Sequence, residues 1–146
     1  MKIQIKQFDK KYLDEMAKVF VDSFSSQKYP IETEWAIRYI SYNLEMSPDL
    51  CLMALDDNGV CLGAMFSREE PFFRGNSINL DFVLVKKEFR KKGVAKTLFK
   101  KVLELAKEKD LKIAHGLAEG GNKFPISWYK RLGFNESGWV EIELAL

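Results

Sequence analysis

The segment from residue 78 to residue 109 most constrains the fold, because an apolar strand pattern passes through a basic turn into an amphipathic helix. Residues 78–85 are rich in β-forming side chains, and apolar residues then recur at helical spacing: Ala95, Leu98, Val102, Leu105 and Ala106. The turn therefore sits at a helix N-terminus, where free amide N–H groups and the helix dipole favour an anion. Gly93 in this turn has no side chain to obstruct a phosphate, so the segment predicts a site for a phosphate-bearing cofactor.

Two common phosphate loops do not match this turn. A P-loop, G-x-x-x-x-G-K-[ST], would need glycine where the chain has Arg90 and Ala95. A dinucleotide fingerprint needs a G-x-G-x-x-G run, whereas Gly93 stands alone. The pattern that fits is [Q/R]-x-x-G-x-[G/A], over residues 90–95, preceded by a strand that ends at Val85. With this pattern, the chain resembles the GNAT superfamily of acetyl-CoA-dependent N-acetyltransferases.

A second motif supports the resemblance. Asn122 is followed seven residues later by Tyr129 and then by Gly133 and Phe134, which looks like the late helix of the GNAT superfamily. The two motifs occur in the expected order. The resemblance is specific over about residues 78–134 and elsewhere rests on the order of the elements.

The resemblance implies acetyl-CoA (coenzyme A) as the cofactor. In this superfamily, amides of the central strand bind the thioester and pantetheine, and amides of the following loop bind the pyrophosphate. The cofactor-binding residues implied are Leu84, Val85, Arg90, Lys91, Lys92, Gly93, Val94, Ala95, Lys96, Asn122 and Tyr129.

The catalytic residues implied are Tyr129 and Asp81. A phenol, with an ordinary pKa of about 10, keeps its proton at neutral pH and can donate it to the departing thiolate. By the two-residue alternation of a strand, Asp81 shares a face with Val83 and Val85, and a carboxylate in an otherwise apolar strand indicates a specific role. Its role is open: a base acting through water, a site for the substrate ammonium, or a partner of a nearby Lys or Arg.

Three further assignments bear on the site. Glu119 is a second candidate base, and water is a third. His115, the single histidine, is interpreted as structural, because it lies on a short strand with Ile113 and Leu117 on its face. Nothing in the sequence demands a metal.

Composition predicts a single domain over residues 1–146. A chain of 146 residues with 47% hydrophobic content can bury a real core. It has no apolar run long enough to span a membrane, its first residues alternate like a strand, and a cytoplasmic location is expected. Cys51 and Cys61 flank a predicted hairpin turn without lying opposite one another, so reduced core thiols are expected.

Charge is distributed unevenly along the chain. The net charge is +2, but residues 86–112 hold eleven Lys or Arg against four Asp or Glu, a local +7 that leaves −5 for the remainder. The outer lysines are interpreted as a solvated helix face, whereas Lys91, Lys92 and Lys96 crowd the loop and would attract an anionic cofactor. No nucleic acid is expected, because interleaved aromatics and nucleic-acid motifs are absent.

The fold class expected is α+β, a single-domain GNAT-like fold with a mixed, mostly antiparallel sheet of about seven strands flanked by four helices. The pattern predicts strands at 2–7, 50–56, 60–68, 77–85, 112–117, 133–136 and 139–145, and helices at 10–24, 33–46, 94–109 and 123–131. Asp9 is the expected cap of the first helix, and residues 71–75 are expected to form a loop.

The function expected from the resemblance is transfer of an acetyl group to a primary amine by direct attack in a ternary complex. The alternative is a non-catalytic domain that binds or senses acyl-CoA. The acceptor is expected to be a small-molecule or peptide amine, with no membrane partner, and a homodimer is left open. The aromatic residues that could line the acceptor site are Tyr29, Trp35, Tyr39, Tyr42 and Phe73, although such stripes are more often core.

Overall fold

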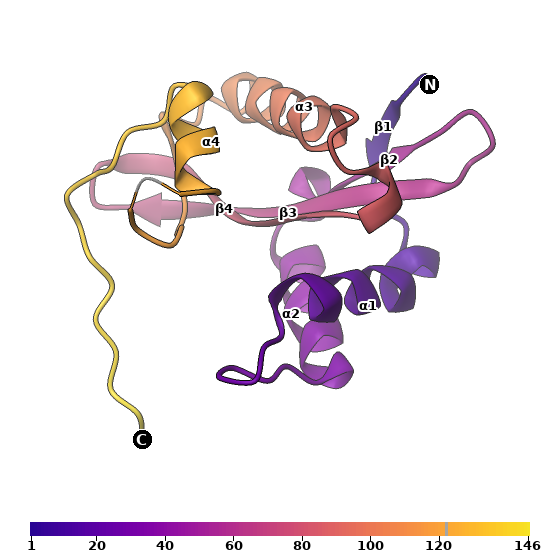
Figure 1. Cartoon of the computed structure of the whole chain (residues 1–146). Coiled ribbons are helices and arrows are strands. Elements are labelled where there is room, and N and C mark those ends of the chain that lie inside the picture. Colours follow the sequence, from indigo (N-terminus) through magenta and orange to yellow (C-terminus); the bar gives the residue numbers. More distant parts are fainter. Residues whose placement is uncertain (122) are drawn as a thin grey trace. The chain divides into compact units, whose positions relative to one another are not determined.

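The structure, a computed structural model, describes residues 1–121 and 123–146, which form two compact units, Met1–Gly116 and Leu117–Leu146. In the first unit (Figure 1) the elements are β1 (Gln4–Gln7), α1 (Leu13–Phe24), α2 (Thr33–Met46), β2 (Leu52–Leu55), β3 (Cys61–Phe72), β4 (Gly75–Val85), α3 (Val94–Glu108) and β5 (Ile113–His115). The second unit holds α4 (Ile126–Arg131). The described residues thus contain four α-helices and a mixed sheet, so the expected fold class is confirmed.

The sheet has five strands in the order β1-β2-β3-β4-β5. Every neighbouring pair is antiparallel except β4 and β5, which run parallel over three residue pairs, from Ser77↔Ile113 to Asn79↔His115. The β3–β4 hairpin closes tightly at Phe72↔Gly75, where Gly75 has a φ of 123°. The two strands therefore extend into the predicted loop at residues 71–75.

Helices cover both faces of this sheet. Figure 1 shows α1 and α2 on one face and α3 on the other. On the first face a core forms around Met16, Ala17, Ile40, Phe66 and Phe82, all buried. On the other face, α3 buries the residues of its apolar stripe, Val94, Leu98, Phe99, Val102 and Ala106. Each large side chain removed from water in this way stabilises the fold by roughly 1.5–3 kcal/mol.

β4 carries one residue more than β3 in the middle of their ladder. Phe66 pairs with Phe82 and Ser67 pairs with Leu80, which leaves Asp81 between them as a β-bulge. A bulge bends the strand and re-aims the side chain that it carries.

The bulge breaks the alternation that was expected to group Asp81 with Val83 and Val85. The Tyr39 hydroxyl of α2 donates to Asp81, and the Tyr39 ring packs on Phe82 with centroids 4.8 Å apart. Two consecutive side chains of β4 therefore meet the same residue of α2. The predicted face of Asp81 is wrong, because a bulge leaves no mark in the apolar pattern.

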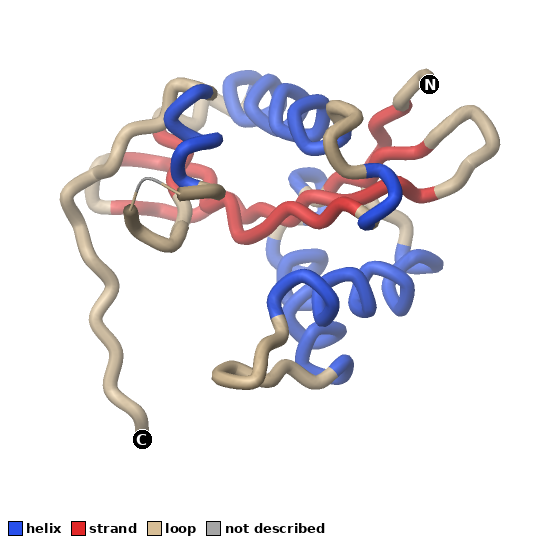
Figure 2. The backbone as a smooth tube through the Cα atoms, viewed as in Figure 1, coloured by secondary structure: helices blue, strands red, loops and turns tan. Residues whose placement is uncertain are grey.

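The expected count of seven strands is also wrong. In the described part of the chain no strand follows β5, and Figure 2 shows the segment after α4 as loop up to the C-terminus. Apolar residues alternate with Glu141 and Glu143 there, yet Ile142 and Leu144 are 89% and 83% exposed. Alternation describes which side chains a strand would bury, but a strand also needs a neighbour to bond with, and that neighbour is not encoded locally.

Other predicted boundaries shift by a few residues. Asp9 does act as a cap, accepting from the Lys11 amide at 2.9 Å, but it caps a 3-10 turn, Lys10–Tyr12, that leads into α1. The expected 123–131 helix is shorter, as α4 begins only at Ile126.

Candidate active site

The basic loop between β4 and α3 has an unusual backbone. After β4 a 3-10 turn, Lys87–Phe89, leads to two left-handed residues, Lys91 with a φ of 62° and Gly93 with a φ of 83°. A non-glycine residue in this conformation costs about 1–2 kcal/mol, and such strain concentrates at functional sites. Left-handed residues in turns are also the geometry from which anion-binding concavities of amides are built.

The amides of this loop are available to a ligand. Arg90 N donates to Lys87 O and Thr97 N donates to Gly93 O, but within the described chain the amides of residues 91–96 have no acceptor. A Cβ placed on Gly93 would meet no heavy atom within 4 Å, so the space beside it is open. Lys91, Lys92 and Lys96 are exposed in the same segment. Free amides, open space and positive charge together fit a diphosphate.

Some of the predicted cofactor-binding residues can contact a cofactor only through their backbone. The side chains of Leu84 and Val94 are buried, so only their backbone groups can face a cofactor. Ala95 is partly buried and likewise offers its amide.

Arg90 braces the loop instead of leaving its guanidinium free. Its Nε donates to the Val85 carbonyl at 3.0 Å and its Nη2 donates to Ser23 Oγ of α1 at 3.2 Å. Lys86 makes a second tie to α1 through an ion pair with Glu15. These contacts hold the loop and the end of β4 against α1.

The edge of β4 beside this loop is open. β5 pairs only with Ser77 to Asn79, so in the described residues β4 has no partner on that edge from Leu80 to Val85. From Leu80 to Val85 the strand spans about 17 Å at the usual rise per residue. An unpaired edge displays N–H and C=O groups to which an extended molecule can bond.

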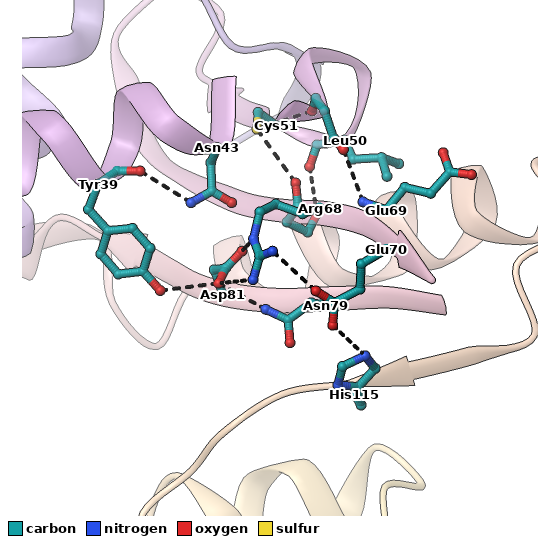
Figure 3. Close-up of polar contacts among 12 residues, drawn as sticks. Tyr39, Asn43, Leu50, Cys51, Arg68, Glu69, Glu70, Asn79, Asp81 and His115 are labelled. Atoms are coloured by element: carbon teal, nitrogen blue, oxygen red, sulfur yellow. Dashed lines mark hydrogen bonds and ion pairs between the residues drawn. The ribbon is translucent and has the colours of Figure 1, made fainter. Parts of the chain in front are cut away.

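Asp81 lies at the centre of a polar cluster (Figure 3). Arg68 donates to both carboxylate oxygens, from Nε to Oδ2 at 2.8 Å and from Nη2 to Oδ1 at 3.2 Å. The Tyr39 hydroxyl and Asn79 Nδ2 donate to Oδ1 at 3.1 and 2.9 Å. The carboxylate is only 5% exposed. Of the three roles left open for Asp81, partnership with an arginine is therefore what the structure shows.

The cluster also changes the acidity of its members. Burial, followed by the charge of Asp81 and the hydrogen bond to it, raises the pKa of Tyr39. The hydrogen bond to Asp81 raises the pKa of the Arg68 guanidinium against the opposing effect of burial. Tyr39 is thus a proton donor to Asp81 that stays protonated, and Arg68 stays charged.

The cluster continues from Asp81 to His115. Arg68 Nη1 donates to Glu70 Oε2 at 3.1 Å, and Glu70 Oε1 lies 3.1 Å from His115 Nε2. The chain of contacts thus joins α2, β3, β4 and β5. Sequence reasoning missed this link because Arg68 and Glu70 lie on β3, Asp81 on β4 and His115 on β5, and only the pairing of these strands brings the side chains together.

The second unit holds the other predicted catalytic residues. Tyr129 lies in α4, with its ring 5.3 Å from Trp128 and 5.5 Å from Phe134, and burial raises the pKa of its phenol. Gly133 ends the motif with a φ of 97°. Glu119 is exposed and lies outside any helix or strand, while Asn122 falls outside the described residues.

Comparison with known proteins agrees with this arrangement. The chain matches the model of the acetyltransferase (GNAT) family over residues 13–134 and belongs to that family. It is therefore an acyltransferase that uses acetyl-CoA, and the predicted resemblance is confirmed. No curated protein matches significantly.

Solved structures share the fold at low sequence identity. Ard1 from Thermoplasma volcanium is 18% identical with a TM-score of 0.76, over 92% of this chain and 84% of that one. The NatC complex bound to Gag peptide and CoA is 19% identical with a TM-score of 0.72, over 90% and 84%. AAC(6')-Iy in complex with the bisubstrate analogue CoA-S-monomethyl-acetylneamine is 19% identical with a TM-score of 0.75, over 100% and 99%. No helix among the described residues is long and apolar enough to cross a bilayer.

Proposed function

We propose that this enzyme transfers the acetyl group of acetyl-CoA to a primary amine by direct attack in a ternary complex. The observation that carries the proposal is the open amide loop at residues 91–96 next to the unpaired edge of β4. When bound, acetyl-CoA supplies a thioester whose carbonyl carbon is open to a neutral amine. The loop amides and Lys91, Lys92 and Lys96 hold the phosphates, and the β4 edge orients the extended arm.

The acidic cluster supports an amine as the acceptor. Asp81 and Glu70 carry two negative charges against the single positive charge of Arg68, which leaves a net −1 on the α2 side of the sheet. A net negative cluster that is shielded from solvent attracts an ammonium group. Asp81 itself serves as electrostatic anchor rather than direct base, since its oxygens already accept four hydrogen bonds.

Tyr129 supplies the proton that the departing sulfur needs. Its pKa, raised by burial, keeps the phenol protonated over the physiological range, so it remains a donor. The acceptor is a small molecule or a peptide, because the similar structures include one solved with a peptide and one with an aminoglycoside-derived analogue. We also infer a cytoplasmic location from the two free, buried cysteines, since reduced thiols are typical there.

The test is release of free thiol from acetyl-CoA in the presence of a panel of amines. The panel contains spermidine, neamine, free lysine and a short peptide with a free N-terminus, and calorimetry with acetyl-CoA runs in parallel. We expect tight cofactor binding and amine-dependent thiol release with at least one member. If the protein binds acetyl-CoA but releases no thiol with any amine of an extended panel, the proposed function is wrong and the chain is a domain that senses acyl-CoA.

A further inference from the structure

His115 is held in a defined orientation at the end of the β4–β5 ladder. It belongs to the last residue pair, Asn79↔His115, beyond which the β4 edge is open. Its ring stacks on Phe72, with centroids 4.4 Å apart and an angle of 18° between the planes, and its side chain is 23% exposed. Figure 3 shows the imidazole directed toward Glu70. The residue is thus fixed in orientation yet open to solvent.

The neighbours of His115 determine which ring nitrogen carries the proton. Nε2 lies 3.0 Å from Ser77 Oγ and 3.1 Å from Glu70 Oε1. The Ser77 hydroxyl uses its one proton to donate to the Glu70 carbonyl at 3.1 Å, so toward the imidazole its oxygen can only accept. An ionised carboxylate also only accepts. An N–H on Nε2 satisfies both neighbours at once, and in that tautomer of the neutral ring the lone pair lies on Nδ1.

Nδ1 is free to take a proton. Among the described residues no hydrogen bond to it is formed. Glu70 lies beside Nε2, on the other side of the ring from Nδ1, and Arg68 holds Glu70 in place through Nη1. The other charged group on this side is Arg74, whose guanidinium lies 5.9 Å from the Phe72 ring on which His115 stacks. This arrangement, a carboxylate that fixes a histidine tautomer and leaves the opposite nitrogen open, is that of a general base.

Asp81 cannot fill this role in the same way. It is 5% exposed, and Arg68, Tyr39 and Asn79 all donate to it. A base needs an unoccupied lone pair that the proton can reach. Nδ1 of His115 has no hydrogen-bond partner among the described residues and meets this condition.

We propose that His115 is the general base of the acetyl transfer and that Glu70 is its positioning residue. The inference rests on the proposed function. The acceptor ammonium gives one proton to Nδ1 and becomes a neutral amine. Its nitrogen then bonds to the acetyl carbon, and the C–S bond breaks as Tyr129 gives its proton to sulfur. The nitrogen releases its second proton to solvent, and solvent returns one proton to the Tyr129 oxygen, which restores the phenol. The proton on His115 passes to solvent, so one proton is released per turnover.

The first test is independent of turnover. Because the chain has a single histidine, its imidazole gives one unambiguous set of ¹⁵N–¹H long-range correlations. We expect the neutral ring to carry its proton on Nε2, and the Glu70→Gln variant to lose this strict preference, since an amide can donate as well as accept. A neutral ring protonated on Nδ1 in the parent protein would overturn the proposal.

The second test uses the amine of the panel that gives the fastest thiol release. His115→Gln keeps a side-chain N–H that can donate to Glu70 and Ser77 but removes the basic nitrogen. We expect kcat/KM to fall by roughly 10²–10⁴-fold and the acidic limb of its pH profile to disappear. Calorimetric affinity for acetyl-CoA should stay within about twofold of the parent, consistent with a residue outside the phosphate loop.

The two proposals fail differently. If His115→Gln retains the parent rate and pH profile, His115 is not the base, while the acetyltransferase proposal stands. If the parent protein binds acetyl-CoA but acetylates no amine, the proposed function fails first, and a role for His115 as general base falls with it whatever its tautomer.

Discussion

At the scale of single residues, Gly93 is the most sensitive position of the cofactor loop. Its φ of 83° is one that residues other than glycine adopt at a cost, and the space where a Cβ would stand is open. That open space is where the loop amides face a phosphate. A side chain at position 93 would therefore mainly block ligand binding. Because it would also strain the backbone, a test needs a control variant with the same strain at a position away from the site.

Gly93→Asp should abolish binding of acetyl-CoA, because a carboxylate would occupy the phosphate site and repel the anion. Gly59→Asp is the matched control: Gly59 also has a left-handed backbone, with a φ of 78°, and open space at its Cβ position, but it lies in the β2–β3 turn. Calorimetry should show loss of binding in the first variant only. Equal binding by both variants would mean that the phosphates lie elsewhere.

Tyr129→Phe tests the proposed acid. The substitution keeps the ring that packs near Trp128 and Phe134 and removes only the hydroxyl. We expect kcat to fall by roughly 10²-fold while acetyl-CoA affinity changes little, as for loss of a single proton donor. Steady-state kinetics from pH 6 to pH 9 provide the measurement. An unchanged kcat throughout would leave water as the proton source.

At the scale of elements, the sequence predicts what local pattern controls. The strand–loop–helix unit at residues 75–108 and the pair α1 and α2 form within a few residues of their predicted bounds, since each has its own periodicity and its own breakers. The bulge at Asp81 and the missing strands after β5 were not predictable in this way. Both depend on pairing with a distant segment, which apolar alternation does not specify.

The candidate site likewise has one part that local sequence predicts and one part that it does not. The phosphate loop was predicted because its glycine, its lysines and its helix start are contiguous in the chain. The cluster that joins Tyr39, Arg68, Asp81 and His115 was not, because its members come from four elements. Long-range side-chain contacts follow from the fold and become visible only with it.

Gly63 shows how closely β3 and β4 approach one another. A Cβ on Gly63 would lie 2.3 Å from the Leu84 carbonyl oxygen, a backbone atom that cannot rotate away. Gly63→Ala should therefore force the strands apart, destabilise the protein by about 1–3 kcal/mol and weaken acetyl-CoA binding at the neighbouring β4 edge. Urea unfolding and calorimetry measure the two effects.

The control for this variant is Gly120→Ala. Gly120 lies outside the sheet, its Cβ position is open and its backbone is not left-handed, so the change should stay within about 0.5 kcal/mol. Identical stability of the two variants would show that the β3–β4 spacing tolerates a methyl group at position 63.

At the scale of the whole molecule, positive and negative charge gather at different places. In the basic segment at residues 86–112, the loop lysines Lys91, Lys92 and Lys96 lie at the proposed phosphate site, whereas the negative charge of the remainder includes the Asp81 cluster. The phosphate loop and the acidic cluster are thus held by one sheet. Binding of an anionic donor and of a cationic acceptor would each be weakened by salt.

The burial of the two cysteines makes the stability of the protein depend on pH. Cys51 and Cys61 are free and fully buried, as expected from the sequence. Burial raises the pKa of the Cys51 thiol from 9.0 to about 12 and that of the Cys61 thiol from 9.0 to about 11. In the unfolded chain both thiols ionise near their ordinary value, whereas in the folded protein they keep their protons to higher pH.

The sign of the effect on stability follows from this difference. Between pH 9 and pH 11 the unfolded state loses thiol protons that the folded state retains, so rising pH favours unfolding. The stabilisation is fully present below pH 9 and is lost progressively up to about pH 12. The two thiols together should lower the free energy of unfolding by about 2.5 kcal/mol between pH 8 and pH 10.

Urea unfolding under reducing conditions at pH 8, 9 and 10 tests this expectation against a Cys51→Ala/Cys61→Ala double variant. The variant starts from a lower stability because it leaves two cavities, but lysine and tyrosine titration affects both proteins alike. The parent should therefore lose more stability than the variant over this range, since only the parent has thiols to ionise on unfolding. Parallel pH dependences would mean that water reaches both thiols in the folded protein, and that the core beneath α1 and α2 is looser than its packing indicates.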